Sequence, residues 1–359
     1  PRRNLLLTEI LKNEGYRTAA FVSNANLSRY FNFNEGFDAY KELWRKQEGP
    51  MHERGWYKAD RVTDESVRWL EKNRSKKFFL WVHYIDPHTV YAPPSPYDNQ
   101  FTNDSFANKY DPVPLEKIKP SNRIGEEKDP DLYVARYDGA IRFMDDQIQT
   151  LLEKLNELGL QDNTILVFAA DHGESFGDNN LFFEHGRFAY ENCARVPLFI
   201  RFPEDIDPQN IEQAVSLIDI YPTVLALARI PQPKPVQGHD LKPALMNGAW
   251  TRSPYVFIES DFQNALRTKD WKLIYALTRD AEKISPLGPF FELYDLSKDP
   301  KERQNLLGTS LPIEGELKTV FEQSFGATKA SLARSAKVSG TPDADPATLE
   351  QLKSLGYIN

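Results

Sequence analysis

The chain has 359 residues, of which 40% are hydrophobic, so it can bury a large core and has the length of one large domain with a smaller one. Its formal net charge of −8 is mild for this size and argues against nonspecific binding to nucleic acid. A single cysteine excludes a disulfide framework within the chain, and no apolar stretch approaches the length of a transmembrane helix.

Helices and strands alternate in the first part of the chain, which is typical of an α/β domain. Residues 8–14 have a helical pattern that ends at Gly15, and residues 18–23 then read as an apolar strand. A second amphipathic helix over residues 60–73 leads into a strand over residues 78–82. This alternation predicts an α/β fold.

A polar, proline-rich excursion interrupts the pattern between residues 94 and 130. An insertion of this length near an active face is more often a substrate-shaping loop than a linker. Residues 131–158 then carry apolar side chains at helical spacing and predict one long helix before a strand over residues 164–170. A further strand is expected over residues 196–200 and a helix over residues 216–227.

The pattern changes from about residue 252 to short aromatic strands, at residues 255–258, 271–275 and 291–294. These strands predict a small antiparallel sheet with a C-terminal helix. We therefore expect a main α/β domain over residues 1–250 and a smaller subdomain over residues 251–359. Residues 326–347 are rich in Ala, Ser, Lys, Pro and Asp and are predicted to be mobile.

Two adjacent polar residues, Asp171 and His172, end the apolar strand over residues 164–170. Open α/β sheets bind their ligands at the carboxyl ends of the strands. The two side chains offer a hard oxygen and a borderline nitrogen to a divalent cation. The alternative is that Asp171 caps a helix and His172 is an ordinary surface residue, because aspartate is a common N-cap. The strand end alone leaves both interpretations open.

The other histidines favour the functional interpretation. His83 and His88 follow the strand over residues 78–82 with a proline between them, so they belong to a strand end and its loop rather than to one helix face. His185 lies in a later, glycine-punctuated loop. Loops at strand ends carry function more often than packing. The remaining two histidines, His52 and His239, lack such a setting and are interpreted as ordinary surface or loop residues.

These motifs resemble the sulfatase family of the alkaline phosphatase superfamily. The resemblance is carried by the box Asp171-His-Gly-Glu174, the box Asp86-Pro-His88, and residues 15–21, 137–146, 195–198, 216–223, 266–274, 291–300 and 352–357. It implies an α/β fold with an alkaline-phosphatase-like mixed sheet sandwiched by helices, and a smaller C-terminal antiparallel sheet. It also implies metal-dependent hydrolysis of a small-molecule or carbohydrate sulfate ester.

The resemblance assigns roles to individual residues. It implies that Asp171 and His172 bind a divalent metal ion together with aspartates outside this chain, since calcium takes about 6 to 8 ligands. Calcium is the family's usual ion, and manganese or zinc are alternatives because imidazole is a softer ligand. His88 is implied as a sulfate contact or general acid. His185, or alternatively Glu184, occupies the region where relatives place a cationic residue, usually a lysine.

The family's nucleophile motif is missing from this sequence. Relatives carry a Cys/Ser-x-Pro-x-Arg pattern in which the first residue is oxidised to formylglycine, and a strand that ends in two metal-binding aspartates. The single cysteine, Cys193, does not match that pattern, and we expect it to be a small buried hydrophobe. The chain opens close to where the family's first long helix is under way. Formylglycine and the paired aspartates are therefore expected in an N-terminal part outside this sequence.

A second departure follows the strand over residues 18–22. Many sulfatases continue there with Gly-Lys-Trp-His, whose lysine and histidine touch the sulfate, whereas this chain has Ser23-Asn-Ala-Asn26. Asn24 is a candidate substrate contact, and its alternative role is a turn former. Loss of two cationic contacts leaves room for a phosphodiester or phosphonate monoester as substrate. A noncatalytic binding module is a third hypothesis, against which the retained metal-site and histidine residues argue.

Overall fold

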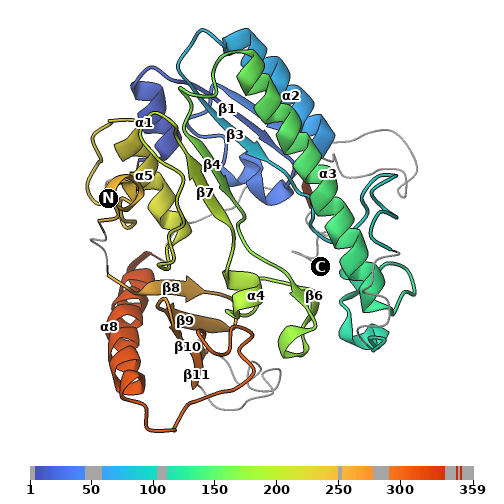
Figure 1. Ribbon diagram of the computed structural model, residues 1–359, viewed down its shortest axis with the longest axis vertical. Coiled ribbons are helices and arrows are strands. Elements are labelled where there is room, and N and C mark those ends of the chain that lie inside the picture. The colour runs from blue at the N-terminus through green and yellow to red at the C-terminus, as the bar shows by residue number, and fades with distance from the viewer. Residues whose placement is uncertain are drawn as a thin grey trace. The chain divides into compact units, whose positions relative to one another are not determined.

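The structure is a computed structural model that describes residues 5–44, 59–102, 111–249, 253–277 and 291–335, with residues 345, 346, 348 and 349 (Figure 1). The chain forms two compact units, one of Pro1–Thr164 with Thr341–Asn359 and one of Ile165–Gly340. His52, residues 250–252 at the predicted domain boundary and residues 352–357 lie outside the described residues. Within the described part, no helix combines the length and the apolar character needed to cross a membrane.

The first unit contains a parallel sheet with the strand order β2-β1-β3. Its strands are β1 (Arg17–Val22), β2 (Ala39–Glu42) and β3 (Phe78–His83). Five of the six β1 residues are buried, because β1 is the central strand of the three. The register pairs Val22 with His83, so the carboxyl ends of β1 and β3 meet at one edge of the sheet.

Helices cover this sheet. They are α1 (Leu7–Asn13), α2 (Ala59–Asn73) and α3 (Pro130–Glu157). Val62 of α2 packs in one apolar cluster with Ala19 and Phe21 of β1, and α2 and α3 lie side by side (Figure 1). The alternate residues of β1, Ala20 and Val22, pack on the other face with the segment that follows the strand. The sheet therefore has an apolar cluster on each face, as period-two alternation requires.

The polar excursion after β3 is packed in its described part rather than extended. It contains two short 3-10 helices, η3 (Leu115–Lys117) and η4 (Pro120–Asn122), and it buries Val113 and Ile118. Gly139 of α3 allows close contact, because a Cβ there would lie 2.2 Å from the carbonyl oxygen of Tyr97. The role of the excursion in shaping a substrate site stays a prediction.

The second unit contains antiparallel strands. β4 (Leu166–Ala169) pairs with β7 (Leu198–Arg201), and β5 (Ser175–Phe176) pairs with β6 (Phe182–Glu184). A larger sheet has the order β11-β10-β9-β8. Its strands are β8 (Val256–Glu259), β9 (Gln263–Arg267), β10 (Trp271–Ala276) and β11 (Phe291–Asp295). The described helices of this unit are η5 (Asp178–Asn180), α4 (Glu191–Ala194), η6 (Leu217–Asp219), α5 (Ile220–Leu227), α6 (Lys242–Asn247) and α8 (Pro312–Ser335).

The four-stranded sheet is covered on both faces. On one face, Leu317 and Phe321 of α8 pack against three buried leucines, Leu266, Leu273 and Leu293. On the other face, Ala265, Ile274 and Tyr294 pack against Phe188, Ala189 and Tyr190. The second cluster bears on function, because its chain segment directly follows His185.

The structure confirms most of the predicted elements and the α/β fold class with its small antiparallel sheet. Two predictions need correction. The strand expected over residues 164–170 has four residues, and these are partly exposed because its only partner in the described residues is β7. The segment predicted to be mobile begins instead as helix, since α8 runs to Ser335 and residues 326–335 include the good helix formers Ala, Lys, Leu and Arg. Residues 336–344 lie outside the described residues, and the boundary at residue 250 stays a prediction.

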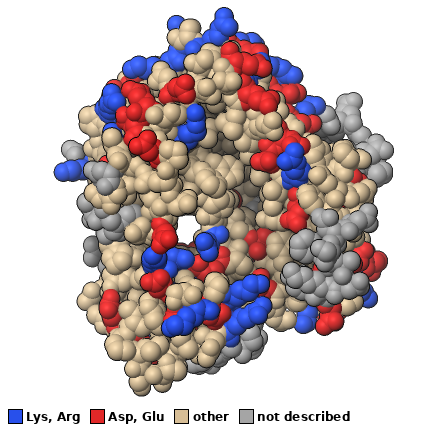
Figure 2. Space-filling view, in the orientation of Figure 1, with Lys and Arg blue, Asp and Glu red and all other residues tan. Residues whose placement is uncertain are grey.

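Acidic and basic side chains are interspersed over the face of the molecule shown in Figure 2. Ion pairs within α3 include Arg142 with Asp146 at 2.6 Å and Lys154 with Glu157 at 2.6 Å. Exposed pairs of this kind contribute little to stability.

Candidate active site

The β4 strand leads directly to Asp171 and His172. The Asp171 side chain is 75% exposed and the His172 side chain 32% exposed, so both are accessible to a ligand. The backbone N–H of His172 donates to Asp171 Oδ1 at 3.0 Å, and His172 Nε2 lies 3.7 Å from the same oxygen. Two atoms that bind one cation at about 2.0–2.5 Å and roughly right angles lie about 3–3.5 Å apart. This pair is therefore close to the spacing that a shared metal ion requires.

The orientation of the His172 ring is set by its own backbone. Nδ1 lies 2.9 Å from the carbonyl oxygen of Gly173, and because a carbonyl can only accept, Nδ1 carries the hydrogen. Nε2 is then the nitrogen with a lone pair, and it is the one beside Asp171. Metal-binding histidines are commonly oriented by such a bond from the second ring nitrogen. The donor set thus fits a divalent cation.

Gly173 is required for this geometry. Its N–H donates to the carbonyl oxygen of Cys193 at 2.7 Å. A Cβ at position 173 would lie 2.1 Å from the carbonyl oxygen of Asn192, closer than any side chain tolerates. Gly173 therefore lets the loop after β4 lie directly on α4, which fixes where His172 projects.

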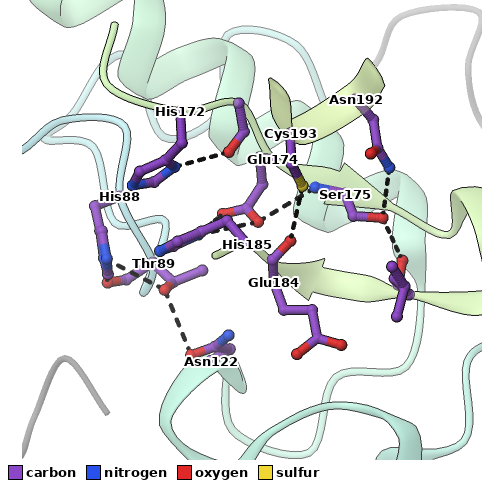
Figure 3. Close-up of polar contacts among 12 residues, drawn as sticks. His88, Thr89, Asn122, His172, Glu174, Ser175, Glu184, His185, Asn192 and Cys193 are labelled. Atoms are coloured by element: carbon purple, nitrogen blue, oxygen red, sulfur yellow. Dashed lines mark hydrogen bonds and ion pairs between the residues drawn. The ribbon is translucent and has the colours of Figure 1, made fainter. Parts of the chain in front are cut away.

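His185 lies against this loop (Figure 3). Its Nδ1 is 3.2 Å from Oε2 and 3.3 Å from Oε1 of Glu174, whose side chain is only 5% exposed. Its ring stacks on that of His172, with 3.9 Å between the centroids and 18° between the planes. The structure thus brings together two residues predicted from sequence, His172 and His185, and it shows that the Glu174 carboxylate contacts His185.

The segment after His185 is held by the turn between β8 and β9. The N–H of Asp261 donates to the Gly186 carbonyl at 3.3 Å, and the N–H of Phe262 donates to the Arg187 carbonyl at 3.1 Å. The Arg187 guanidinium lies 4.8 Å from the centre of the Phe262 ring, a cation–π contact. The small antiparallel sheet therefore helps to position the loop that carries His185.

Two neighbours of His185 have structural roles in this geometry. The Glu184 carboxylate pairs with Arg187 at 3.3 Å and extends away from Glu174 and His185 in Figure 3. Cys193 is buried, and its thiol lies 3.7 Å from the Glu184 carbonyl oxygen. Burial, followed by the negative charge of Glu174, raises the pKa of the Cys193 thiol to about 12. Cys193 is thus a buried, protonated thiol, as the sequence predicts.

The first unit holds a group of polar residues where β1 and β3 end. The Ser23 hydroxyl donates to the His83 carbonyl and accepts from the Ile85 N–H, each at 2.9 Å. Asp86 accepts from the N–H of Ala59 at 3.0 Å, the first residue of α2. These bonds tie both strand ends and the start of α2 to the loop that carries His88.

His88 lies in that loop, in a tight turn closed by a bond from its N–H to the Ile85 carbonyl at 2.8 Å. Its Nδ1 lies 2.7 Å from the Thr89 carbonyl oxygen, and because a carbonyl only accepts, Nδ1 carries a hydrogen in this bond. The Thr89 hydroxyl lies 3.4 Å from Asn122 (Figure 3). Tyr91 is fully buried and packs edge-on against Tyr137, so it is a packing aromatic.

Asn24 has a local structural role. Its Oδ1 accepts from the N–H of Asn26 at 3.0 Å, which caps η1 (Ala25–Leu27), itself followed by η2 (Arg29–Phe31). This is the turn-forming role that the sequence left open. Asn24 as a substrate contact stays a prediction.

Sequence reasoning did not assign a role to Glu174, although it lies in the Asp171 box. No spacing rule links it to His185, because the two are eleven residues apart, with β5, η5 and β6 between them. Among the described residues, no group of three or more His, Cys, Asp or Glu side chains is arranged to hold a metal ion. Asp171 and His172 as metal ligands stay a prediction.

The chain matches the Sulfatase family model over residues 1–230, which is more than half of its length. It also matches the model described as N-sulphoglucosamine sulphohydrolase, C-terminal, over residues 177–324. The chain therefore belongs to the sulfatase family.

Its relatives include bacterial sulfatases. An arylsulfatase of Clostridium perfringens is 31% identical over 284 residues, which cover 74% of this chain and 56% of the relative. An N-acetylglucosamine-6-O-sulfatase of Bacteroides thetaiotaomicron is 27% identical over an alignment 398 residues long, which covers 84% of this chain and 68% of the relative. The chain thus spans 56% and 68% of the length of these two relatives.

Solved structures share the fold. One was determined in complex with its substrate D-glucosamine-2-N,6-O-disulfate and has a TM-score of 0.70 at 23% identity, covering 91% of this chain and 83% of that one. A phosphonate monoester hydrolase of Agrobacterium radiobacter has a TM-score of 0.69 at 20% identity, covering 92% of this chain and 81% of that one. At these identities the likeness shows the fold alone.

Proposed function

We propose that this chain hydrolyses sulfate esters as part of a sulfatase whose formylglycine nucleophile comes from a segment outside this sequence. The observation that carries the proposal is the arrangement of Asp171, His172 and His185, in which each histidine is oriented by a bond at Nδ1 and the two rings stack. Membership of the sulfatase family supports it.

Asp171 and His172 would hold a divalent cation through Oδ1 and Nε2. Calcium is our first expectation, and the imidazole ligand leaves manganese or zinc as alternatives. When bound, such an ion polarises the sulfate group and stabilises the charge that develops on its oxygens. Further ligands would come from aspartates outside this sequence, since two donors satisfy neither calcium nor zinc.

The histidines would act on the ester itself. His185, with hydrogen on both ring nitrogens, would donate Nδ1–H to Glu174 and Nε2–H to the sulfate, whose negative charge the second bond would stabilise. His88, with Nδ1–H donated to the Thr89 carbonyl and a second hydrogen on Nε2, would present Nε2–H as a second sulfate contact or as the acid that protonates the leaving oxygen. Both roles use Nε2, because Nδ1 of each ring is already bonded, to Glu174 in His185 and to the Thr89 carbonyl in His88.

The proposed substrate is a small-molecule or carbohydrate sulfate ester. A relative is an N-acetylglucosamine-6-O-sulfatase, and one similar structure holds a disulfated glucosamine as its substrate. We infer from these relatives that a sulfated sugar is the natural substrate class.

A phosphodiester or phosphonate monoester is the second candidate. The observation that favours it is the sequence Ser23-Asn-Ala-Asn26, where many sulfatases carry a lysine and a histidine that contact sulfate. A phosphonate monoester hydrolase shares the fold.

The first test is substrate preference. The complete gene product is assayed with 4-nitrophenyl sulfate and with bis(4-nitrophenyl) phosphate under identical conditions. We expect the higher kcat/KM for the sulfate. A clear preference for the phosphodiester would favour the second candidate, and no turnover of either ester would favour a noncatalytic binding module.

The second test is metal content. We expect Asp171→Ala to lose its bound metal by elemental analysis, whereas Asp207→Ala, which replaces an exposed aspartate in the same unit, should retain it. Unchanged metal content in Asp171→Ala would refute the ligand assignment.

The third test addresses the nucleophile. We expect the gene segment upstream of Pro1 to encode a paired-aspartate strand and a Cys/Ser-x-Pro-x-Arg motif. Mass spectrometry of the mature protein should then show formylglycine at the first position of that motif. A threonine or an unmodified serine there would favour the phosphoester candidate.

A further inference from the structure

Glu174 is a buried carboxylate next to residues that contact solvent. Its side chain is 5% exposed, whereas that of Asp171, three residues earlier, is 75% exposed. Burying a carboxylate without a partner costs several kcal/mol, as an order of magnitude. The partners of Glu174 therefore indicate what the residue is for.

The basic partner of Glu174 is a histidine. Among the described residues, its ion pair is with His185, whose Nδ1 lies 3.2 and 3.3 Å from the two carboxylate oxygens. Its other bond is local, a donation from the Ser175 N–H at 3.3 Å. Glu184, by contrast, pairs with an arginine, as a carboxylate with a purely structural role commonly does. The Glu174 side chain is thus directed at an imidazole rather than at a permanent cation.

The His185 ring is restrained from three directions. Glu174 holds it at one edge, and the His172 ring covers one face at 3.9 Å. The backbone beyond His185 is held by the turn between β8 and β9, through Gly186 and Arg187. A histidine side chain rotates about χ1 and χ2, and the hydrogen bond to the Glu174 carboxylate favours one of the resulting ring orientations. Because a carboxylate only accepts, Nδ1 must carry the hydrogen in this bond.

We propose that Glu174 is a positioning residue for His185: it accepts a hydrogen bond from Nδ1–H and so directs Nε2, rather than Nδ1, to the ester group. Glu174 itself touches no reacting atom. The proposal rests on the role given to His185 above. It extends that role by explaining how a histidine can serve where the resemblance implies a lysine. Lysine has one side-chain nitrogen, whereas a histidine ring has two and needs a second group to fix which of them faces the substrate.

The test uses Glu174→Gln, which preserves the size of the side chain but allows its amide to donate as well as accept. We expect kcat for 4-nitrophenyl sulfate to fall roughly 10- to 100-fold, as for other groups that orient a functional histidine, with little change in KM. We also expect the 15N NMR signals of His185 to lose the pattern of a protonated Nδ1. In a His185→Ala background, Glu174→Gln should cause no further loss of kcat.

The matched control is Glu184→Gln, which removes a buried carboxylate adjacent to His185 in sequence but paired with Arg187. It should leave the 15N pattern of His185 unchanged. An unaltered 15N pattern and kcat in Glu174→Gln would overturn the proposal, as would an equal loss of kcat with and without His185.

A measurement on the unmodified protein guards against a variant that does not fold. His185 should show a protonated Nδ1 by 15N NMR, and a ring protonated only at Nε2 would overturn the proposal. This result does not depend on turnover. If the ester hydrolysis proposed above fails while the 15N pattern is as expected, the function is wrong and the Glu174–His185 pairing still holds.

Discussion

Arg267 of β9 and Glu191 of α4 form a two-point ion pair inside the second unit. Nε and Nη2 of the arginine lie 3.0 and 2.9 Å from the two carboxylate oxygens. Lys272, whose side chain is fully buried, lies 3.1 Å from the same carboxylate and 2.9 Å from that of Glu302. This network attaches α4 to the four-stranded sheet. Because Cys193 of α4 accepts the bond from Gly173, the network also supports the loop that carries His172.

Removing one charge from this network should destabilise the protein strongly. Glu191→Gln leaves Arg267 and the buried Lys272 incompletely neutralised, and breaking a buried pair in this way costs about 3–5 kcal/mol. Urea unfolding followed by circular dichroism measures this difference. Glu259→Gln, at an exposed position of the same sheet, should change the free energy of unfolding by less than about 0.5 kcal/mol. Equal effects of the two substitutions would show that the network contributes nothing specific.

The same network predicts a pH dependence. The positive charges of Lys272 and Arg267 outweigh the effect of burial and hold the pKa of Glu191 at about 2, below its unfolded value of about 4.3. A depressed carboxyl pKa contributes stability that is fully present above the unfolded pKa and is lost as the pH falls toward 2. The pKa of Glu302 is raised, mainly by burial, and its contribution has the opposite sign.

Comparing the unmodified protein with Glu191→Gln isolates the contribution of Glu191 to the pH dependence of stability. The difference in unfolding free energy between the unmodified protein and Glu191→Gln should be constant above about pH 5 and should shrink between about pH 4 and pH 2. Urea unfolding at a series of pH values measures it. A difference that stays the same down to pH 2 would contradict the pKa assigned to Glu191.

Gly173 should tolerate no side chain. In Gly173→Ala the new Cβ would lie 2.1 Å from the Asn192 carbonyl oxygen, so the loop must move away from α4. We expect a loss of about 1–3 kcal/mol of stability, as for other overpacked sites, together with loss of the proposed metal ion as His172 shifts. Gly315→Ala is the control, since its Cβ would meet nothing within 4 Å and it lies in α8. It should raise stability by roughly 0.5–1 kcal/mol. Normal metal content in Gly173→Ala would contradict the role given to this glycine.

Local patterns in the sequence were sufficient to predict the elements that have strong periodicity. The spacing of apolar residues predicts α3, and the apolar run before Asp171 predicts the strand that presents it. The composition of residues 326–347 wrongly predicted a mobile segment from its first residue. Helix formers lie before residue 336 and the prolines and aspartates after it, so the composition of the whole segment hides the end of α8.

The candidate site was only partly predictable, for a physical reason. Residue type marks Asp171, His172 and His185 as candidate site residues. The groups that orient them are brought close by tertiary contacts, which follow no sequence period. The pairing of Glu174 with His185 depends on how β5 and β6 pair, and the cap made by Asn24 depends on the turn after β1. Neither contact follows from helix or strand periodicity.

Cys193 should be chemically inert in the folded protein. Its side chain is buried, and burial together with the charge of Glu174 raises the pKa of its thiol to about 12, so little thiolate forms at pH 8. We expect iodoacetamide at pH 8 to leave the native protein unmodified at this residue and to add one carbamidomethyl group after unfolding in urea, as measured by mass spectrometry of the peptide.

Coexpression with a formylglycine-generating enzyme should also leave Cys193 as cysteine, because residues 193–197 do not match the motif that the enzyme reads. Rapid alkylation of the native thiol would mean that this site is open to solvent, and an aldehyde at position 193 would identify Cys193 itself as the source of the nucleophile.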